Sequence, residues 1–155
     1  IIFLIFLCKI LKILNTTRYL SFLNLYIFYY EMGRYNSKFY NKSLEIKKIS
    51  KKISDYIIFE LSNSTDYSKN TILFFSGDIV QQSDIISEEI IKAQVSLISE
   101  NKNSHIKTIQ WLIFRLMQTC KRIENSYSNS KDYISILVKE INKFKLLKKS
   151  WLMTL

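Results

Sequence analysis

Apolar residues recur at helical spacing through most of the second half of the chain. After Gln82 the pattern predicts one helix capped by Ser83, a second helix with the clearest apolar stripe, and a last helix capped by Ser130. Polar breaks are expected at residues 101–104 and 125–130. The stripe of the second helix is formed by Ile106, Ile109, Ile113, Leu116, Cys120 and Ile123. We expect this stripe to be buried in a core.

An earlier helix is predicted from Ser43, which is placed to cap it. Its apolar residues follow spacings of three and four, and four lysines occupy the opposite face: Lys47, Lys48, Lys51 and Lys52. A basic amphipathic helix of this kind can bind phosphates or anionic lipid. A solvated lysine face over an apolar seam has the same pattern. Residues 139–149 form a second lysine-rich stretch.

Two stretches between these helices favour strands. The segment Tyr56–Leu61 is rich in β-formers, and the run Thr71–Phe75 stops at Ser76, Gly77 and Asp78. We expect a buried strand that ends in a tight loop, with a positive φ angle at Gly77 and backbone N–H groups presented at the loop. The predicted fold class is therefore α+β, helix-dominated with one or two strands.

Residues 1–31 form an apolar segment that differs from the rest of the chain. Its uncharged runs, Ile1–Leu7 and Tyr19–Tyr30, are each shorter than the ~20 residues that span a bilayer as a helix. Three interpretations remain open: an anchoring or targeting segment, upstream sequence that precedes a true start at Met32 (a gene-model artefact), or a core helix. Residues 32–155 are expected to form a single small basic domain.

Composition adds two constraints. The chain has no proline and only two glycines, which favours helix. Its net charge of +10 favours an anionic partner such as nucleic acid or an anionic membrane surface, although a lysine-rich solvated surface has the same charge. Cys8 and Cys120 are far apart and lack metal-type spacing, so neither a disulfide framework nor a metal site is predicted.

Candidate catalytic residues are scarce. His105 is the only histidine and has no cysteine or acidic residue beside it in the sequence, which indicates a surface or capping role. The chain contains no Gly-x-Ser-x-Gly elbow, no glycine-rich phosphate loop and no acidic metal cluster. No complete catalytic constellation, and no cofactor, is therefore predicted.

One motif has a resemblance to a known family. The residues Ile-Leu-Phe-Phe-Ser-Gly-Asp-Ile-Val-Gln at 72–81 resemble the signature hydrophobic-Leu-aromatic-Phe-Pro-Gly-Asp-Val-Gln of a eukaryotic α/β-hydrolase-like family, which is named for an open reading frame on human chromosome 2. Ser76 stands where the family has proline, and Val80 is an insertion. The family's nucleophilic serine has no counterpart here.

The resemblance implies an N-terminal fragment of an α/β-hydrolase-like three-layer fold and a mitochondrial location. Gly77 and Asp78 would then lie where such folds build an oxyanion hole from backbone N–H groups. The implied function is a catalytically incomplete hydrolase-like protein. The alternative is a basic helical protein that binds an anionic membrane surface or nucleic acid through residues 43–52 and 139–149. Such a protein would be membrane-associated, with its apolar N-terminus as a tether.

Overall fold

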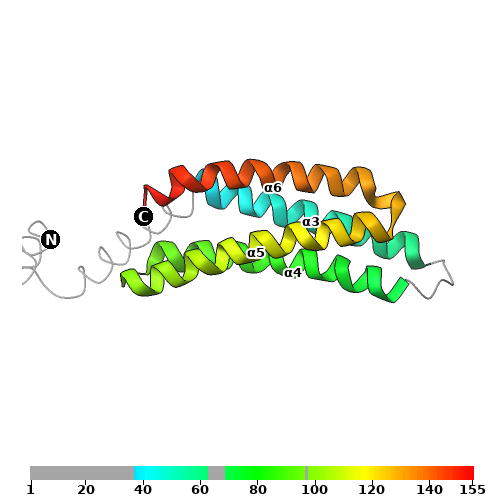
Figure 1. The fold of residues 1–155 in the computed structure, drawn as a ribbon, viewed down its shortest axis with the longest axis horizontal. Coiled ribbons are helices and arrows are strands. Elements are labelled where there is room, and N and C mark those ends of the chain that lie inside the picture. The colour runs from blue at the N-terminus through cyan, green and yellow to red at the C-terminus, as the bar shows by residue number, and fades with distance from the viewer. Residues whose placement is uncertain (1–36, 63–68, 97) are drawn as a thin grey trace, which may run out of the picture. The chain divides into compact units, whose positions relative to one another are not determined.

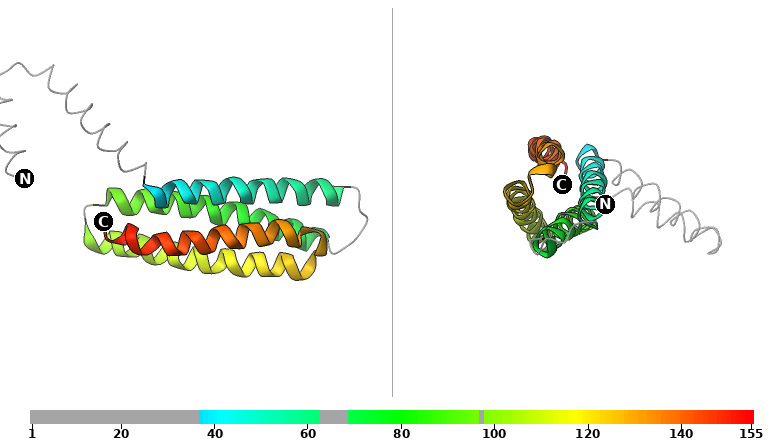
Figure 2. Two further views of the ribbon diagram at one scale, coloured as in Figure 1. Left: turned by 90° about the horizontal axis from the view of Figure 1, so that it is seen from above. Right: turned by 90° about the vertical axis from the view of Figure 1, so that its right-hand side faces the viewer.

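A seven-residue repeat of buried positions runs through the helices of the computed structural model, which describes residues 37–62, 69–96 and 98–155. The helices pack side by side into a four-helix bundle (Figures 1 and 2). No strand occurs in this part of the chain, so the α+β prediction and the α/β-hydrolase-like three-layer fragment are wrong. The elements are α3 (Lys38–Ser62), α4 (Lys69–Val95), α5 (Ser99–Ser126), the 3-10 turn η1 (Ser128–Ser130) and α6 (Lys131–Leu152).

The first described helix starts earlier and ends later than its sequence pattern predicts. Ser37, rather than Ser43, caps α3, because its Oγ accepts a hydrogen bond from the Tyr40 N–H at 3.1 Å. Ser43 lies inside the helix and donates its hydroxyl to the Tyr40 carbonyl at 2.6 Å. The predicted strand Tyr56–Leu61 is the last part of α3, since Ile57 continues the buried stripe of this helix.

The predicted strand Thr71–Phe75 and the loop at Gly77 lie inside α4. The buried residues of α4 repeat at spacings of four and three, and this periodicity outweighs the local run of β-formers. Gly77 has a helical backbone without a positive φ angle, so the predicted strained loop is wrong. The repeat consists of Ile72, Ser76, Ile79, Ser83, Ile86, Ile90 and Ala93.

The third helix confirms its predicted stripe but not its predicted start. Residues 101–104, expected to be a break, lie in the first turns of α5. Ser83, expected to cap a helix, lies inside α4 and donates to the Val80 carbonyl at 2.8 Å. Ile106 is half-buried, and the other members of the stripe are fully buried as predicted: Ile109, Ile113, Leu116, Cys120 and Ile123.

Small polar residues line the contact between α3 and α4. Ser54 of α3 and Ser76 of α4 meet with their hydroxyl oxygens 3.4 Å apart. Because serine is small, the two helix axes can approach closely along this line. We call this line the serine seam. It consists of Ser43, Ser50 and Ser54 of α3 and Ser76, Ser83 and Ser87 of α4, all buried.

Aromatic stacking joins the two helices at the ends of the described chain. Phe39 of α3 stacks on Phe144 of α6 with ring centroids 4.2 Å apart. Near the other end of α3, the ring centroids of Tyr56 and Tyr133 of α6 lie 4.6 Å apart. None of the described helices is long and apolar enough to cross a bilayer. Residues 1–31 and the predicted targeting segment lie outside the described residues.

Candidate anion-binding surface

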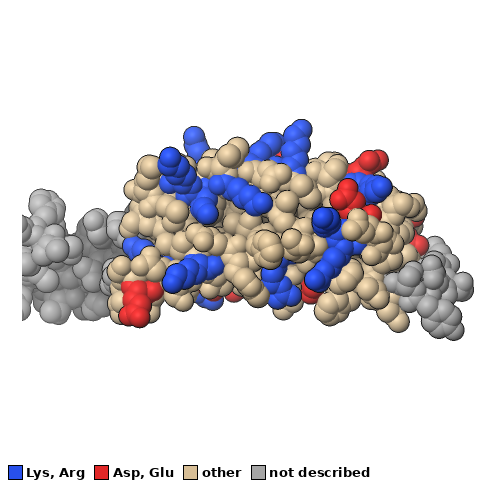
Figure 3. All heavy atoms as spheres, in the orientation of Figure 1, with Lys and Arg blue, Asp and Glu red and all other residues tan. Residues whose placement is uncertain are grey.

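Charge is distributed unevenly among the four helices. The α4 sequence holds four acidic residues against two lysines. By contrast, α6 holds six lysines against Asp132 and Glu140, and α5 holds five lysines and arginines against Glu100 and Glu124. Basic side chains accordingly spread over the surface that α5 and α6 present in Figure 3. The α3 sequence likewise holds six lysines against three acidic residues, so α3, α5 and α6 all carry net positive charge and α4 does not.

Two exposed stripes with seven-residue spacing lie on α5 and α6. Positions seven apart lie on the same face of a helix. Two side chains in the middle of these stripes are apolar: Phe114 is 59% exposed and Leu146 is 80% exposed. Lys149 lies one turn from Leu146 and is also exposed. We define the α5–α6 face as Lys107, Phe114 and Lys121 of α5 with Lys139, Leu146, Lys149 and Met153 at and after α6.

The hairpin between α5 and α6 brings these stripes into register. Tyr127 and η1 make a short connection, in which the Tyr127 N–H donates to the Ile123 carbonyl at 2.8 Å. Lys121 and Lys139 lie at nearly equal distances from this turn, as do Phe114 and Leu146. The mismatch is less than one helical turn of about 3.6 residues. Phe114 and Leu146 therefore lie at similar heights along the two helices, and lysines precede and follow each of them.

The lysines of the α5–α6 face are not neutralised within the described residues. Lys107, Lys121, Lys139 and Lys149 are exposed and form no ion pair with any described acidic residue. The sequence between residues 101 and 123 of α5 contains no acidic residue. The face can therefore offer its full charge to an external anion.

Glu140, the acidic residue nearest the middle of α6, points into an internal ion-pair cluster. Its carboxylate accepts hydrogen bonds from Lys143 at 2.7 Å and from Lys42 of α3. These bonds from Lys143 and Lys42 lower the pKa of the Glu140 carboxyl, despite its burial. Glu140 therefore connects α6 to α3 and does not neutralise the lysines of the α5–α6 face.

The lysines predicted as a binding face on α3 divide into two groups. Lys47 forms an ion pair with Asp84 of α4 at 2.5 Å, and the hydrogen bond raises the pKa of its ammonium group. Lys48, Lys51 and Lys52 are exposed and have no ion pair within the described chain. Three of the four predicted lysines thus remain accessible on α3.

Gly77 and Asp78 do not form the oxyanion-type loop suggested by the sequence. Both lie in the interior of α4, where backbone N–H groups bond to carbonyls one turn earlier. An oxyanion hole requires N–H groups that are free to donate to a reacting oxygen. The local backbone therefore lacks the donors that the resemblance implied.

His105 has an acidic partner that its sequence neighbours do not reveal. Its Nδ1 lies 2.7 Å from Glu89 Oε2 across the α4–α5 contact, and Lys92 donates to the same carboxylate at 2.7 Å. Burial opposes ionisation of Glu89, but the hydrogen bonds from Lys92 and His105 outweigh it and lower the Glu89 pKa. Only the helical hairpin brings these residues together, since His105 is sixteen positions from Glu89.

The described residues do not complete a catalytic or metal site around this pair. No described hydroxyl or thiol bonds to His105, and no group of three potential metal ligands occurs. Burial raises the pKa of the Cys120 thiol to about 12, which keeps it protonated at neutral pH. The His105–Glu89 pair connects α4 to α5.

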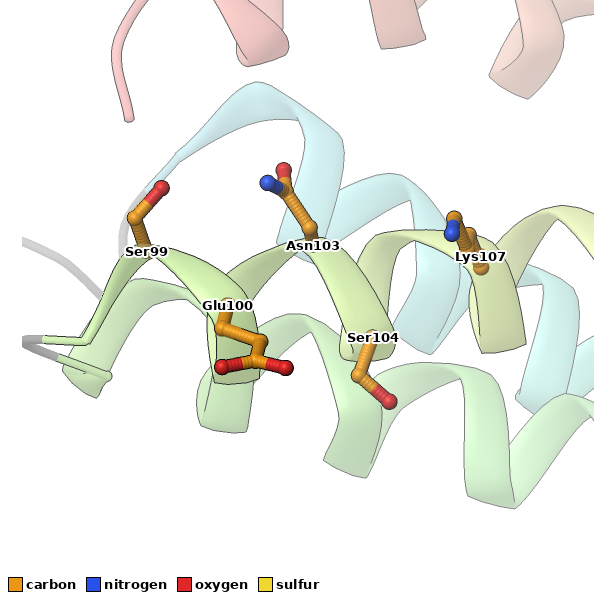
Figure 4. A pocket seen from close by; sticks show the side chains of 5 residues that line it. All are labelled: Ser99, Glu100, Asn103, Ser104 and Lys107. Atoms are coloured by element: carbon orange, nitrogen blue, oxygen red, sulfur yellow. The ribbon is translucent and has the colours of Figure 1, made fainter.

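A shallow depression on the first turns of α5 is equally unsuited to chemistry. Its side chains all come from one helix and project in different directions (Figure 4). Converging groups from several elements are the usual mark of a small-molecule site. The lining residues are Ser99, Glu100, Asn103, Ser104 and Lys107.

Comparison with known proteins adds no functional assignment. No protein-family model, curated protein or solved structure matches the chain. The α5–α6 face is accordingly interpreted from its own geometry and charge.

Proposed function

We propose that the protein is a binding protein without catalytic activity, which attaches to phosphate-bearing partners through the α5–α6 face. The supporting observation is that four exposed lysines on two adjacent helices have no ion-pair partner among the described residues: Lys107, Lys121, Lys139 and Lys149. Lysines on a solvated surface attract phosphates through long-range electrostatics and release counterions on binding. The proposal replaces the hydrolase-like reading, whose fold is contradicted by the helical bundle.

The expected binding mode is electrostatic and depends on salt. Each phosphate that a lysine neutralises releases bound counterions, so affinity falls as salt concentration rises. The internal pairing of Lys47 with Asp84 reduces the charge available on α3. The exposed Lys48, Lys51 and Lys52 also lie within one turn of an acidic residue of α3, Glu45 or Asp55. Residues 101–123 of α5 include no acidic residue, so we expect the α5–α6 face to contribute more than the exposed α3 lysines.

Two variants with equal net charge test this proposal on the full chain. One replaces Lys107, Lys121, Lys139 and Lys149 with Gln, and the other replaces Lys38, Lys48, Lys51 and Lys52 with Gln. The measurement is the salt concentration that elutes each protein from phosphocellulose. We expect the α5–α6 variant to elute well before the α3 variant. Equal elution would mean that overall charge, and not this face, determines binding, and no retention of the wild-type chain would exclude the proposal altogether.

A further inference from the structure

We propose that the partner of the α5–α6 face is an anionic phospholipid membrane, with Phe114 and Leu146 inserted at the level of the headgroups. This inference rests on the proposed function and adds the kind of surface. Phe114 and Leu146 are exposed, at 59% and 80%, at positions that a purely electrostatic site would leave polar.

The mixture of side chains fits a lipid headgroup boundary. Lysine ammonium groups reach phosphates while their aliphatic stems lie along apolar surface, and neighbouring apolar side chains enter the acyl boundary. Met153, also on the α5–α6 face, is 76% exposed and aliphatic. Interfacial helices likewise combine lysine and arginine with Trp, Phe or Leu side chains that enter the headgroup and acyl boundary.

The same composition fits single-stranded nucleic acid less well. Proteins of that class stack bases on aromatic rings and use arginine for planar contacts. Phe114 is the one aromatic residue among the members of the α5–α6 face, and the cations of the face are lysines. The exposed Trp111 beside it on α5 already stacks with Arg115, whose guanidinium lies 4.9 Å from the ring centroid. Leu146 and Met153 have no planar surface on which a base could stack, so binding of a polynucleotide would not explain why these apolar side chains are exposed.

The shape of the face also suits a membrane. Lys107 to Lys121 covers fourteen residues of α5, or about 21 Å at 1.5 Å per residue, and Lys139 to Met153 covers the same length at the neighbouring α6. Each stripe is therefore elongated along its helix and is not a groove. The uncharged sequence runs before residue 31, rich in Tyr and Phe, have the composition of a headgroup boundary as well.

An experiment on the full chain distinguishes electrostatic attraction of the lysines from membrane insertion of the apolar side chains. The apolar variant Phe114→Ser with Leu146→Ser is compared with a matched control, Phe59→Ser with Phe74→Ser, which removes two other exposed apolar side chains from α3 and α4. Partitioning is measured by sedimentation with phosphatidylcholine vesicles, with and without phosphatidylserine, at lipid concentrations below saturation. The residues before α3 are common to all proteins, so their contribution cancels in the comparison.

We expect the wild-type chain to prefer phosphatidylserine vesicles. We expect the apolar variant to lose on the order of tenfold in partition coefficient, while the control variant stays near wild type. On phosphocellulose, the apolar variant should elute like wild type, because its lysines are intact. Circular dichroism melting verifies that both variants remain folded, as expected for exposed positions.

Failures of the two proposals give different results. Retention on phosphocellulose without preference for phosphatidylserine vesicles, or an apolar variant that partitions like wild type, overturns the membrane inference and leaves the proposed function standing. Tighter binding to a single-stranded oligonucleotide than to vesicles at equal salt also overturns it. Absence of binding to both phosphocellulose and vesicles overturns the proposed function itself.

Discussion

Phe39 of α3 and Trp151 of α6 stack with ring centroids 4.4 Å apart and planes inclined by 21°. Trp151 is 3% exposed, whereas the other tryptophan, Trp111, is 53% exposed on α5. Phe144 also stacks on Phe39, with ring centroids 4.2 Å apart, so three rings join the first and last described helices. Closure of the bundle therefore depends on residues that are far apart in the sequence.

This contact can be observed by fluorescence. In a Trp111→Phe background, emission should come from Trp151 alone and should be blue-shifted, because the ring is buried. Adding Phe39→Ala should shift the emission to the red and cost about 3–5 kcal/mol in unfolding free energy, as truncation of a buried aromatic does. Unchanged emission and stability in the double variant would contradict the stacked arrangement.

The change in stability on replacing Gly77 with alanine distinguishes a helical backbone from a strained loop at this position. The Gly77 backbone is helical, and a Cβ atom added there would meet no atom within 4 Å. Gly77→Ala should therefore stabilise the bundle by about 0.5–1 kcal/mol, measured by urea denaturation, because alanine loses less entropy in a helix. A destabilised variant would instead agree with the strained loop that the sequence pattern predicted.

The prediction of a strand and a tight loop at residues 71–78 is wrong for a physical reason. The predicted strand rests on apolar residues alone, whereas two of the seven positions in the buried repeat of α4 are serines, Ser76 and Ser83. With these positions treated as polar, the run Thr71–Phe75 resembles a strand that ends at a turn. In α5 the buried repeat is nearly all apolar, and its stripe was predicted correctly.

The candidate surface was predictable in part. The lysine-rich stretch at 139–149 is visible in the sequence, and three of the four predicted lysines on α3 are exposed and unpaired within the described chain. The pairing of Lys47 with Asp84 and the inward orientation of Glu140 depend on packing between distant helices. The alignment of Phe114 with Leu146 likewise requires the α5–α6 hairpin.

Two leucines should respond very differently to the same truncation. Leu116 is fully buried, so Leu116→Ala should cost about 2–5 kcal/mol in unfolding free energy. Leu146 is 80% exposed, and Leu146→Ala should change stability by no more than about 0.5 kcal/mol. Urea denaturation of both variants measures the difference. Similar losses in the two variants would mean that α6 is packed differently from the arrangement described here.

The internal carboxylates predict acid sensitivity. The pKa of Glu140 is lowered from its ordinary value of 4.5 by its lysine partners, and that of Glu89 is lowered as well. The unfolded chain therefore binds more protons near this pH, so stability present above about pH 4.5 is lost as pH falls through the lowered pKa values. Thermal melting between neutral pH and about pH 3 measures this loss.

Glu140→Gln is the informative variant for this effect. It should be less stable than wild type at neutral pH, because Lys42 and Lys143 lose a charged partner, and its stability should depend less on pH. Asp132→Asn, which removes an exposed carboxylate from the same helix, is the control and should keep the wild-type slope. Identical slopes in Glu140→Gln and wild type would exclude Glu140 as a source of acid sensitivity.

The serine seam leaves the position of α3 along α4 ambiguous. A slide that moved Ser54 from Ser76 to Ser83 would also bring Ser50 opposite Ser87, so small side chains would again meet small side chains. The seam therefore sets how near the helices lie but does not select one register. That selection falls to contacts without a repeat, such as Lys47 with Asp84. Two ion pairs of α3, the Gln94–Ser37 hydrogen bond and a few stacked rings thus distinguish the native alignment from a neighbouring one displaced by about 10 Å, seven residues at 1.5 Å each.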